Sequence, residues 1–96
     1  MPHKLFWTSL ALKDLLEIRQ YIQRGNPKAA KAEAKNIKKS TERLQRFPES
    51  GKKSEHIPSV RELVSDHYRI FYRIHFSKVE ILRIYHAKRR LSLNKK

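Results

Sequence analysis

The sequence predicts an α+β fold, in which an N-terminal hairpin of two antiparallel helices packs on one face of an antiparallel sheet of three to four strands. Two observations predict this arrangement. Apolar residues recur with the helical period in the first half of the chain, and the second half contains three segments rich in Val, Ile, Phe and Tyr. A chain of 96 residues has room for one small core, so we expect a single domain over residues 1–96.

The two helices are predicted over residues 9–24 and 27–46. Thr8 and Ser9 suit the N-cap of the first helix. Gly25 can end that helix, Asn26 can cap the second, and Pro27 fits its first turn. A connection this short predicts an antiparallel hairpin. The stripes that the helices are expected to bury are Ala11, Leu15, Ile18 and Ile22 in the first, and Ala30, Ala34, Ile37, Thr41 and Leu44 in the second.

Three strands are predicted over residues 60–64, 68–76 and 79–87. The breaks between them are so short that they can only join antiparallel neighbours. The apolar segment 3–7 is a candidate further strand at a sheet edge, and the segment 47–58, with two of the four prolines, is predicted to be a loop.

The formal net charge is +14, from 23 Lys and Arg against 9 Asp and Glu. A field of this size attracts polyanions, so the candidate partners are nucleic acid, an acidic protein or an anionic membrane surface. Charged residues interrupt the apolar N-terminal segment before a signal peptide or membrane span is complete, which predicts a cytoplasmic protein without membrane association. The chain has no cysteine, only two glycines and no ligand-like spacing of histidines, so we expect no metal centre and no cofactor.

A candidate binding surface comes from strand 68–76. Alternation places Tyr68, Ile70 and Tyr72 on one face and Arg69, Arg73 and His75 on the other. In the last strand Leu82, Ile84 and His86 share a face, and Arg83 shares the other with Tyr85. Arg61, in the preceding strand, is expected to complete a cluster with Arg69 and Arg73, and Arg83 and Tyr85 are expected to extend the same open surface. The cations expected to bind phosphate or a partner are Arg61, Arg69, Arg73, Arg83, Arg89 and Arg90.

Two ordinary interpretations stand beside this one. Charged residues on an exposed sheet face are common, and Glu62 and Glu80 are available for cross-strand pairs. Arg89 and Arg90 also belong to a basic terminus, which can be merely solvated.

RNA cleavage would need little more than such a basic face. A phosphorane can be stabilised by Arg, but Arg never gives up its proton, so a His or Tyr must transfer protons. Tyr85 and His86, at the end of the last strand, are the candidate catalytic residues for this chemistry.

Five segments, in this order, resemble the ParE/RelE superfamily of bacterial type II toxins: LKDLLEIRQYI, NPKAA, LQRFPESG, RELVSDHYRIFYRI and VEILRIYHAKR. The resemblance extends over nearly the whole chain. It implies a helical hairpin on an antiparallel sheet, which agrees with the fold derived from the residues alone. It also implies a cognate antitoxin, a protein whose acidic or amphipathic segment wraps the toxin.

The superfamily has two mechanisms. RelE-like members cut mRNA on the ribosome, whereas ParE-like members poison DNA gyrase. The NPKAA connection, the RELVSDHYRI segment and the ending ILRIYHAKR look more ParE-like. For the RelE-like mechanism, Arg61 and Arg69 fall where phosphate-contacting arginines lie in the family, and Tyr85 or His86 falls near the catalytic position, but no Glu is placed as a base.

The sequence therefore predicts the toxin of a toxin–antitoxin module, with DNA gyrase as the favoured target. The alternative is a ribosome-dependent mRNA endoribonuclease, and a third interpretation is an inactive relative that serves only as a binding module.

Overall fold

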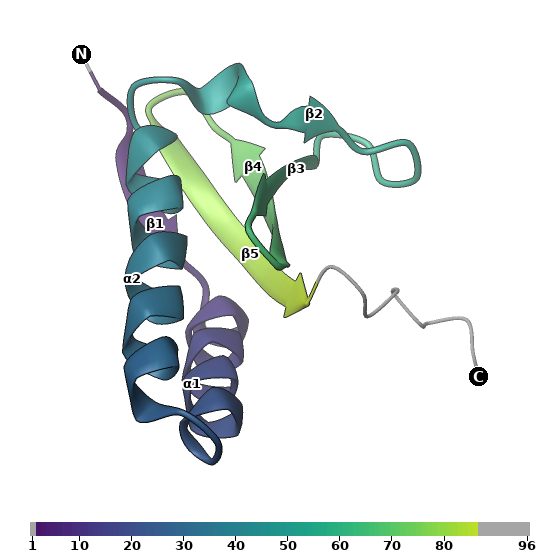
Figure 1. Cartoon of the computed structure of the whole chain (residues 1–96). Coiled ribbons are helices and arrows are strands. Elements are labelled where there is room, and N and C mark those ends of the chain that lie inside the picture. Colours follow the sequence, from purple (N-terminus) through teal and green to yellow (C-terminus); the bar gives the residue numbers. More distant parts are fainter. Residues whose placement is uncertain (1, 87–96) are drawn as a thin grey trace.

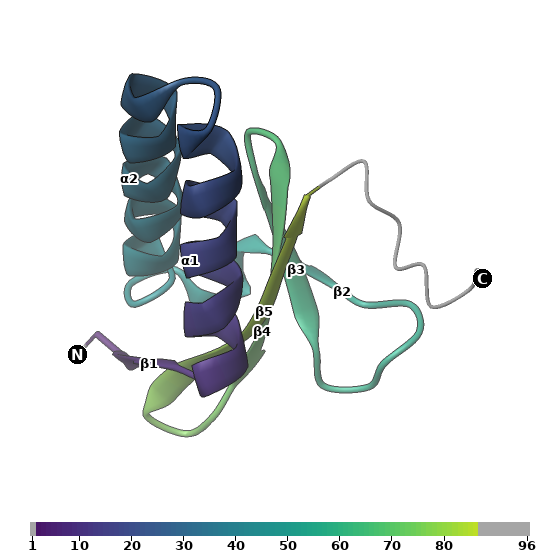
Figure 2. The same cartoon turned by 90° about the horizontal axis from the view of Figure 1, so that it is seen from below.

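The structure of the protein is a computed structural model that describes residues 2–86, except for the side chain of Gln23. Its elements, in chain order, are β1 (Lys4–Trp7), α1 (Ser9–Gln23), α2 (Pro27–Arg43), the 3-10 turn η1 (Pro48–Ser50), β2 (Lys52–Lys53), β3 (Arg61–Ser65), β4 (Tyr68–Ile74) and β5 (Lys78–His86). The two helices run side by side and cover one face of the sheet, as Figures 1 and 2 show. The predicted α+β fold with its helical hairpin is confirmed.

The sheet has five strands rather than the three to four expected, in the order β1-β5-β4-β3-β2. β1 occupies the predicted edge position but runs parallel to β5. The other neighbouring strands of the sheet are antiparallel to each other, so the sheet is mixed. β2 lies inside the segment predicted as a loop. It consists of Lys52 and Lys53 alone, which pair with Glu62 and Arg61, so no apolar alternation announces it in the sequence.

Both helices begin at the predicted caps. The side chain of Thr8 accepts a hydrogen bond from Ala11 N at 3.0 Å, and the side chain of Asn26 accepts one from Ala29 N at 3.1 Å. α2 ends at Arg43, three residues earlier than predicted, because the chain tightens into successive turns there. The N–H groups of residues 44, 45 and 46 bond to carbonyls three residues back.

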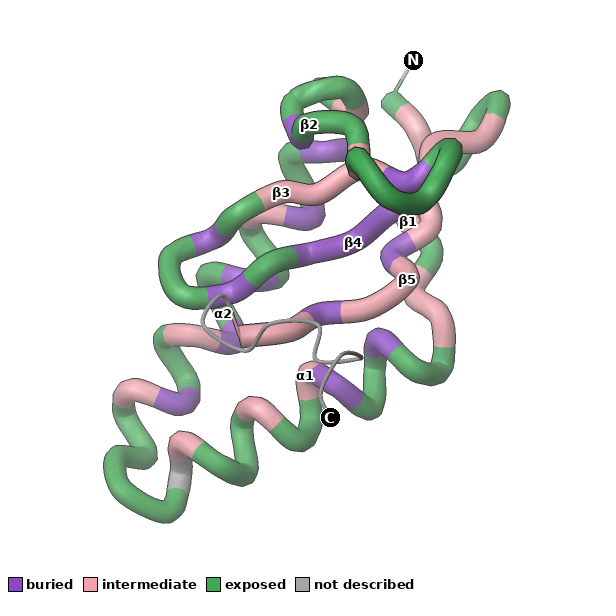
Figure 3. The backbone as a smooth tube through the Cα atoms, turned by 90° about the vertical axis from the view of Figure 1, so that its right-hand side faces the viewer, coloured by how far each residue is buried: buried purple, intermediate pink, exposed green. Residues whose placement is uncertain are grey.

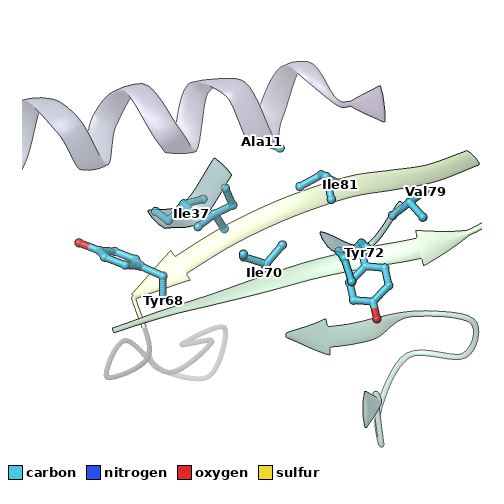
Figure 4. Close-up of a cluster of buried hydrophobic side chains, with 9 residues drawn as sticks. Ala11, Ile37, Tyr68, Ile70, Tyr72, Val79 and Ile81 are labelled. Atoms are coloured by element: carbon cyan, nitrogen blue, oxygen red, sulfur yellow. The ribbon is translucent and has the colours of Figure 1, made fainter. Parts of the chain in front are cut away.

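The core lies between the helices and the sheet (Figure 4). From the helical layer it takes Ala11 of α1, Ile37 of α2 and Leu44, the C-cap residue of α2. All three have no exposed surface, which confirms the predicted stripes at these positions. From the sheet it takes Tyr68, Ile70, Tyr72, Val79, Ile81 and Ile84. Figure 3 shows how burial concentrates in the central strand β4, whose two neighbours shield it.

A β-bulge in β5 decides which side chains reach the core. Phe71 pairs with Arg83 but the next residue, Tyr72, pairs with Ile81, so Leu82 has no partner in β4. An extra residue shifts the alternation by one position. Ile81 and Ile84, three residues apart, therefore both face the helices, and the predicted grouping of Leu82 with Ile84 is wrong.

Candidate functional site

The face of the sheet opposite the helices, which we call the open face, is defined by the register of β4. Ile70 and Tyr72 point into the core, so Arg69, Phe71 and Arg73 point away from it. The β5 residues opposite these three are Tyr85, Arg83 and Glu80. The structure thus brings Arg69, Arg73, Arg83 and Tyr85 onto one face.

The middle of the open face is aromatic. Phe71 is only 8% exposed, and the Tyr85 ring meets it edge-on with centroids 5.7 Å apart. The Arg83 guanidinium carbon lies 5.0 Å from the centroid of the Tyr85 ring, within the range of a cation–π contact. This side of the sheet therefore presents rings and guanidiniums together, which suits contact with an anionic or aromatic partner.

The arginines on the open face differ in how free their charges are. Arg69 Nη1 lies 3.7 Å from Glu62 Oε1, and 44% of the Arg69 side chain is exposed, so this pair is a weak surface contact. Arg73 stands opposite Glu80, but the Glu80 carboxylate bonds to His75 Nε2 at 2.8 Å instead. Within residues 2–86, the buried Nε of Arg73 has no hydrogen-bond partner. Buried donors are nearly always paired, so this Nε is an unused hydrogen-bond donor within the described part of the chain.

Arg83 is held by Asp14 of α1. Its Nε and Nη2 donate to the two Asp14 oxygens at 2.8 and 3.0 Å. This hydrogen bond raises the pKa of Arg83, while partial burial acts in the opposite direction. The pair forms because β1 covers β5 only over residues 78–81, which leaves the edge beyond open to α1. The positive charge of Arg83 is therefore largely neutralised by Asp14 within the protein.

Arg61 lies on the other side of the sheet from Arg69 and Arg73. It shares a face of β3 with Leu63, which packs on the core, and it pairs in register with Tyr72. The cluster of Arg61 with Arg69 and Arg73 that the sequence suggested is not formed. The side chains of β3 do alternate between the two faces of the sheet. The sequence did not show which face of β3 meets the helices.

Arg61 instead stabilises the turn that leads into β2. Its Nη1 donates to the Gly51 carbonyl at 2.7 Å. The hydroxyl of Tyr72 donates to the Pro48 carbonyl at 2.6 Å and accepts from Gly51 N at 2.9 Å. Burial raises the pKa of Tyr72, because ionising this hydroxyl would put a charge inside the core. Arg61 and Tyr72 together fix η1 and β2 against the sheet.

Tyr85 and His86 lie on opposite faces of β5. His86 is paired in register with Tyr68, whose ring it meets edge-on at a centroid distance of 5.2 Å, and it stacks on His67 at 6.2 Å. Since Tyr68 belongs to the core cluster, His86 is on the helix side, whereas Tyr85 is on the open face. Arg89 and Arg90 lie outside the described residues.

A groove of about 720 Å³ lies between α1 and the C-terminal end of β5. Its walls include Ile18 and Tyr21 of α1 on one side, and Tyr68, Ile84 and His86 of the strands on the other. The Tyr21 side chain stands 76% exposed at this groove. Sequence reasoning missed the site because it forms between segments more than 40 residues apart; its local signal is a Tyr placed off the buried stripe.

α1 also carries apolar residues away from the groove. Leu12 and Leu16, one helical turn apart, are 53% and 52% exposed. No helix among the described residues is long and apolar enough to cross a bilayer. Within the same part of the chain, no three His, Asp or Glu side chains gather into a possible metal site.

Taken together, the helical hairpin, the mixed sheet with a basic open face and the groove between α1 and β5 define a small basic domain of the ParE/RelE type. A family model described as the ParE toxin of the type II toxin–antitoxin system parDE matches residues 5–91. The chain therefore belongs to the ParE toxin family, within the ParE/RelE superfamily of type II toxin–antitoxin toxins.

Two curated relatives are similar over most of their length. Toxin RelE2 of Caulobacter vibrioides is 38% identical over 87 residues, which are 90% of this chain and 97% of the relative. The putative toxin Y4kP of Sinorhizobium fredii is 40% identical over 86 residues, which are 88% of each chain. Both names describe toxins, so the relatives support the same class.

Two solved structures have a similar fold. A chain of the chromosomal ParDE toxin–antitoxin system from P. aeruginosa has a TM-score of 0.80 and 26% identity, with 90% of this chain and 97% of that chain covered. A chain of the toxin–antitoxin complex RelBE2 from Mycobacterium tuberculosis has a TM-score of 0.66 and 24% identity, with 90% and 99% covered. The second likeness concerns the fold alone.

Proposed function

We propose that this toxin inhibits growth by poisoning DNA gyrase. The observation that carries the proposal is the separation of the groups that a ribonuclease would need. Cleavage at one phosphate requires the proton-transfer groups and the phosphate-binding cations to lie within hydrogen-bond reach of it. Tyr85 and His86 are on opposite faces of β5, and Arg61 is on the opposite face from Arg69.

The family comparisons support the same mechanism. The matching family model is that of ParE toxins, and the ParDE chain superposes with a higher TM-score than the RelBE2 chain, 0.80 against 0.66. The relative named RelE2 shows that both names occur among similar chains, so the target must be established by experiment.

We further propose that a cognate antitoxin neutralises the toxin by covering the open face and the groove. The solved relatives come from toxin–antitoxin systems or complexes. In this chain, Arg69 and Arg73 on the open face would attract acidic residues, and Ile18, Tyr21 and Ile84 in the groove would bind apolar ones. Charge complementarity of this kind mainly raises the rate of association, and apolar burial provides most of the lasting affinity. Both partners would meet in the cytoplasm.

The proposal is tested by a short induced pulse of the toxin in bacteria, with incorporation of labelled thymidine and of labelled amino acids followed in the same culture. A gyrase poison stops thymidine incorporation first, and the purified protein should then inhibit supercoiling by purified bacterial gyrase and trap cleaved DNA. If amino-acid incorporation stops first, the ribosome is the target. If neither changes, the chain is an inactive relative that acts only as a binding module.

One observation favours the alternative, a ribosome-dependent mRNA endoribonuclease. Arg69, Arg73 and Tyr85 share the open face, and the buried Nε of Arg73 lacks a partner within the described residues. These groups could hold a phosphate, with Tyr85 as one proton-transfer group and His75, bonded to Glu80 opposite Arg73, as a second titratable side chain on the same side of the sheet. If this alternative is correct, Tyr85→Phe abolishes mRNA cleavage mapped by primer extension, and His86→Ala leaves it unchanged.

A further inference from the structure

Three of the four phenylalanines of this chain are at least half exposed. Phe6 is 50% exposed, Phe47 62%, and Phe76 is as exposed as an isolated residue, at 101%. A single exposed apolar residue is ordinary, but several large ones in one region of a small protein mark an interaction surface.

The three phenylalanines belong to segments that meet at one end of the molecule. His3 N donates to the Gln45 carbonyl at 2.8 Å, which joins the start of β1 to the segment after α2. Lys4 N donates to the Ser77 carbonyl at 2.9 Å, which joins β1 to the β4–β5 turn. In Figures 1 and 2 the start of β1, the end of α2 and the β4–β5 turn lie at the same end. We call Phe6, Phe47 and Phe76, with the cations Lys4, Arg46 and Lys78 beside them in the chain, the aromatic end.

The packing of the core gives no reason for a phenylalanine at positions 6, 47 and 76, because all three side chains are exposed. Phe76 lies at the tip of the β4–β5 hairpin, which His75 N closes by donating to the Lys78 carbonyl at 2.8 Å. Gly, Asn, Asp and Ser are the residues that favour such tips, and a fully exposed ring contributes nothing to the core. Backbone bonds nevertheless hold the segments in place, so binding here would cost little additional ordering.

The chemistry of the aromatic end fits a protein surface. Its rings are flanked by Lys4, Arg46 and Lys78, each exposed, and the Lys78 ammonium lies 5.2 Å from the centroid of Phe6. An apolar centre with a charged rim is the usual anatomy of a protein interface. A base-stacking platform would need several rings with open faces, whereas the Lys78 ammonium lies over the Phe6 ring. The complementary partner is an apolar pocket bordered by carboxylates.

The aromatic end is remote from the groove. β5 runs from Lys78 at the aromatic end to His86 at the groove, and eight residue steps along a strand span roughly 26 Å. We infer that the aromatic end is the surface by which this toxin docks on its protein target, with Phe47 and Phe76 as anchors that enter an acidic-rimmed apolar pocket. The identity of the target as gyrase rests on the proposed function; the docking surface itself does not.

The experiment compares the wild-type chain with the double variant Phe47→Ser/Phe76→Ser. Ile57→Ser is the matched control, because Ile57 is a 50% exposed apolar residue in the β2–β3 connection. The variant should lose growth arrest and weaken inhibition of purified gyrase by about 100-fold, since an anchor residue commonly contributes about tenfold or more in affinity. The melting temperature of the double variant and its affinity for the cognate antitoxin should stay at the wild-type values. All properties of the Ile57→Ser control should also stay at those values.

The outcomes separate the two claims. Full growth arrest by the double variant overturns the inference, whatever the target is, and so does a loss of antitoxin binding in parallel with the loss of growth arrest. A wild-type chain that arrests growth without affecting gyrase contradicts the proposed function alone. In that case loss of growth arrest in the double variant, with Ile57→Ser still toxic, continues to support the docking surface.

Discussion

Asp14 on α1 and Arg83 on β5, 69 residues apart, form a two-point ion pair with distances of 2.8 and 3.0 Å. Asp14 Oδ2 also accepts the backbone N–H of Ile84 at 2.9 Å. Beyond residue 81, β5 has no strand on this edge, and the Asp14 carboxylate accepts a backbone N–H that such a strand would otherwise bind. The same contacts hold α1 against the sheet beside the groove. The same contact removes Arg83 from the free cations of the open face.

We expect Asp14→Asn to lower the free energy of unfolding by about 2–3 kcal/mol, because it removes the carboxylate that is hydrogen-bonded to Arg83 and weakens the bond to Ile84 N–H. The estimate is below that for a deeply buried pair, since 36% of the Arg83 side chain is exposed. Urea unfolding measures the change. Glu17→Gln, in the same groove, is the control and should change stability by less than about 0.5 kcal/mol. Equal effects of the two substitutions would mean that the ion pair has no special role.

Gly51→Ala should destabilise the protein by about 2–4 kcal/mol. A Cβ at this position would lie 2.5 Å from the Glu62 carbonyl oxygen and 2.6 Å from the Tyr72 hydroxyl, and one of these is fixed backbone. Gly25→Ala is the matched control: nothing lies within 4 Å of its added Cβ, and stability should stay the same or rise by up to about 1 kcal/mol. Thermal melting of both variants tests this, and a stable Gly51→Ala protein would contradict the packing around Tyr72.

Stability should fall at alkaline pH. The pKa values of Tyr68 and Tyr72 are raised above the ordinary 10.0, chiefly by burial, so folding favours the protonated phenols. Their contribution is complete below pH 10 and is lost as the pH rises through the raised values. Melting temperatures between pH 8 and 12, with phenolate absorbance followed in parallel, measure this loss.

Tyr72→Phe is the informative variant for that pH dependence. It removes the bonds of the hydroxyl to Pro48 and Gly51, so it should lower stability at neutral pH by about 1–2 kcal/mol. It should also make the alkaline fall shallower. Replacing the exposed Tyr21 by Phe serves as the control, and a fall that is equally steep in Tyr72→Phe and in wild type would speak against a buried phenol.

Replacing Arg69 and Arg73 together by Ala should slow association with the antitoxin several-fold and make the rate less sensitive to salt, because both cations lie on the open face. Stopped-flow measurements at two salt concentrations provide the test. Lys35→Ala/Lys39→Ala removes the same charge from exposed positions of α2 and should have a smaller effect. Identical rates for the two double variants would show that only total charge matters.

The pattern of the sequence predicted the helical hairpin well. The caps at Thr8 and Asn26 and the stripe containing Ala11 and Ile37 depend on neighbours within one or two turns, and such local rules apply before any tertiary contact exists. The same holds for the three long strands, whose alternation and short connections leave few other arrangements. The fold class followed from these features, and the family from the resemblance of five segments of the sequence.

The candidate site could be predicted only in part. Arg69, Arg73 and Tyr85 were placed together by alternation alone, and they share the open face. Arg61 was expected beside Arg69 and Arg73 but lies on the helix side of the sheet, as does His86. Strand alternation does not say which face the helices cover or where a bulge shifts the alternation.

The sequence by itself therefore determined the elements, the basic character of the surface and the helical stripes, because each depends on residues close together in the chain. Only the tertiary structure decided that Arg83 is matched by Asp14, that Lys52 and Lys53 form a strand, and that Phe47 and Phe76 lie at the same end. These relationships join segments up to 69 residues apart, and the pairing of distant segments is set by how the whole core packs, which no local pattern encodes.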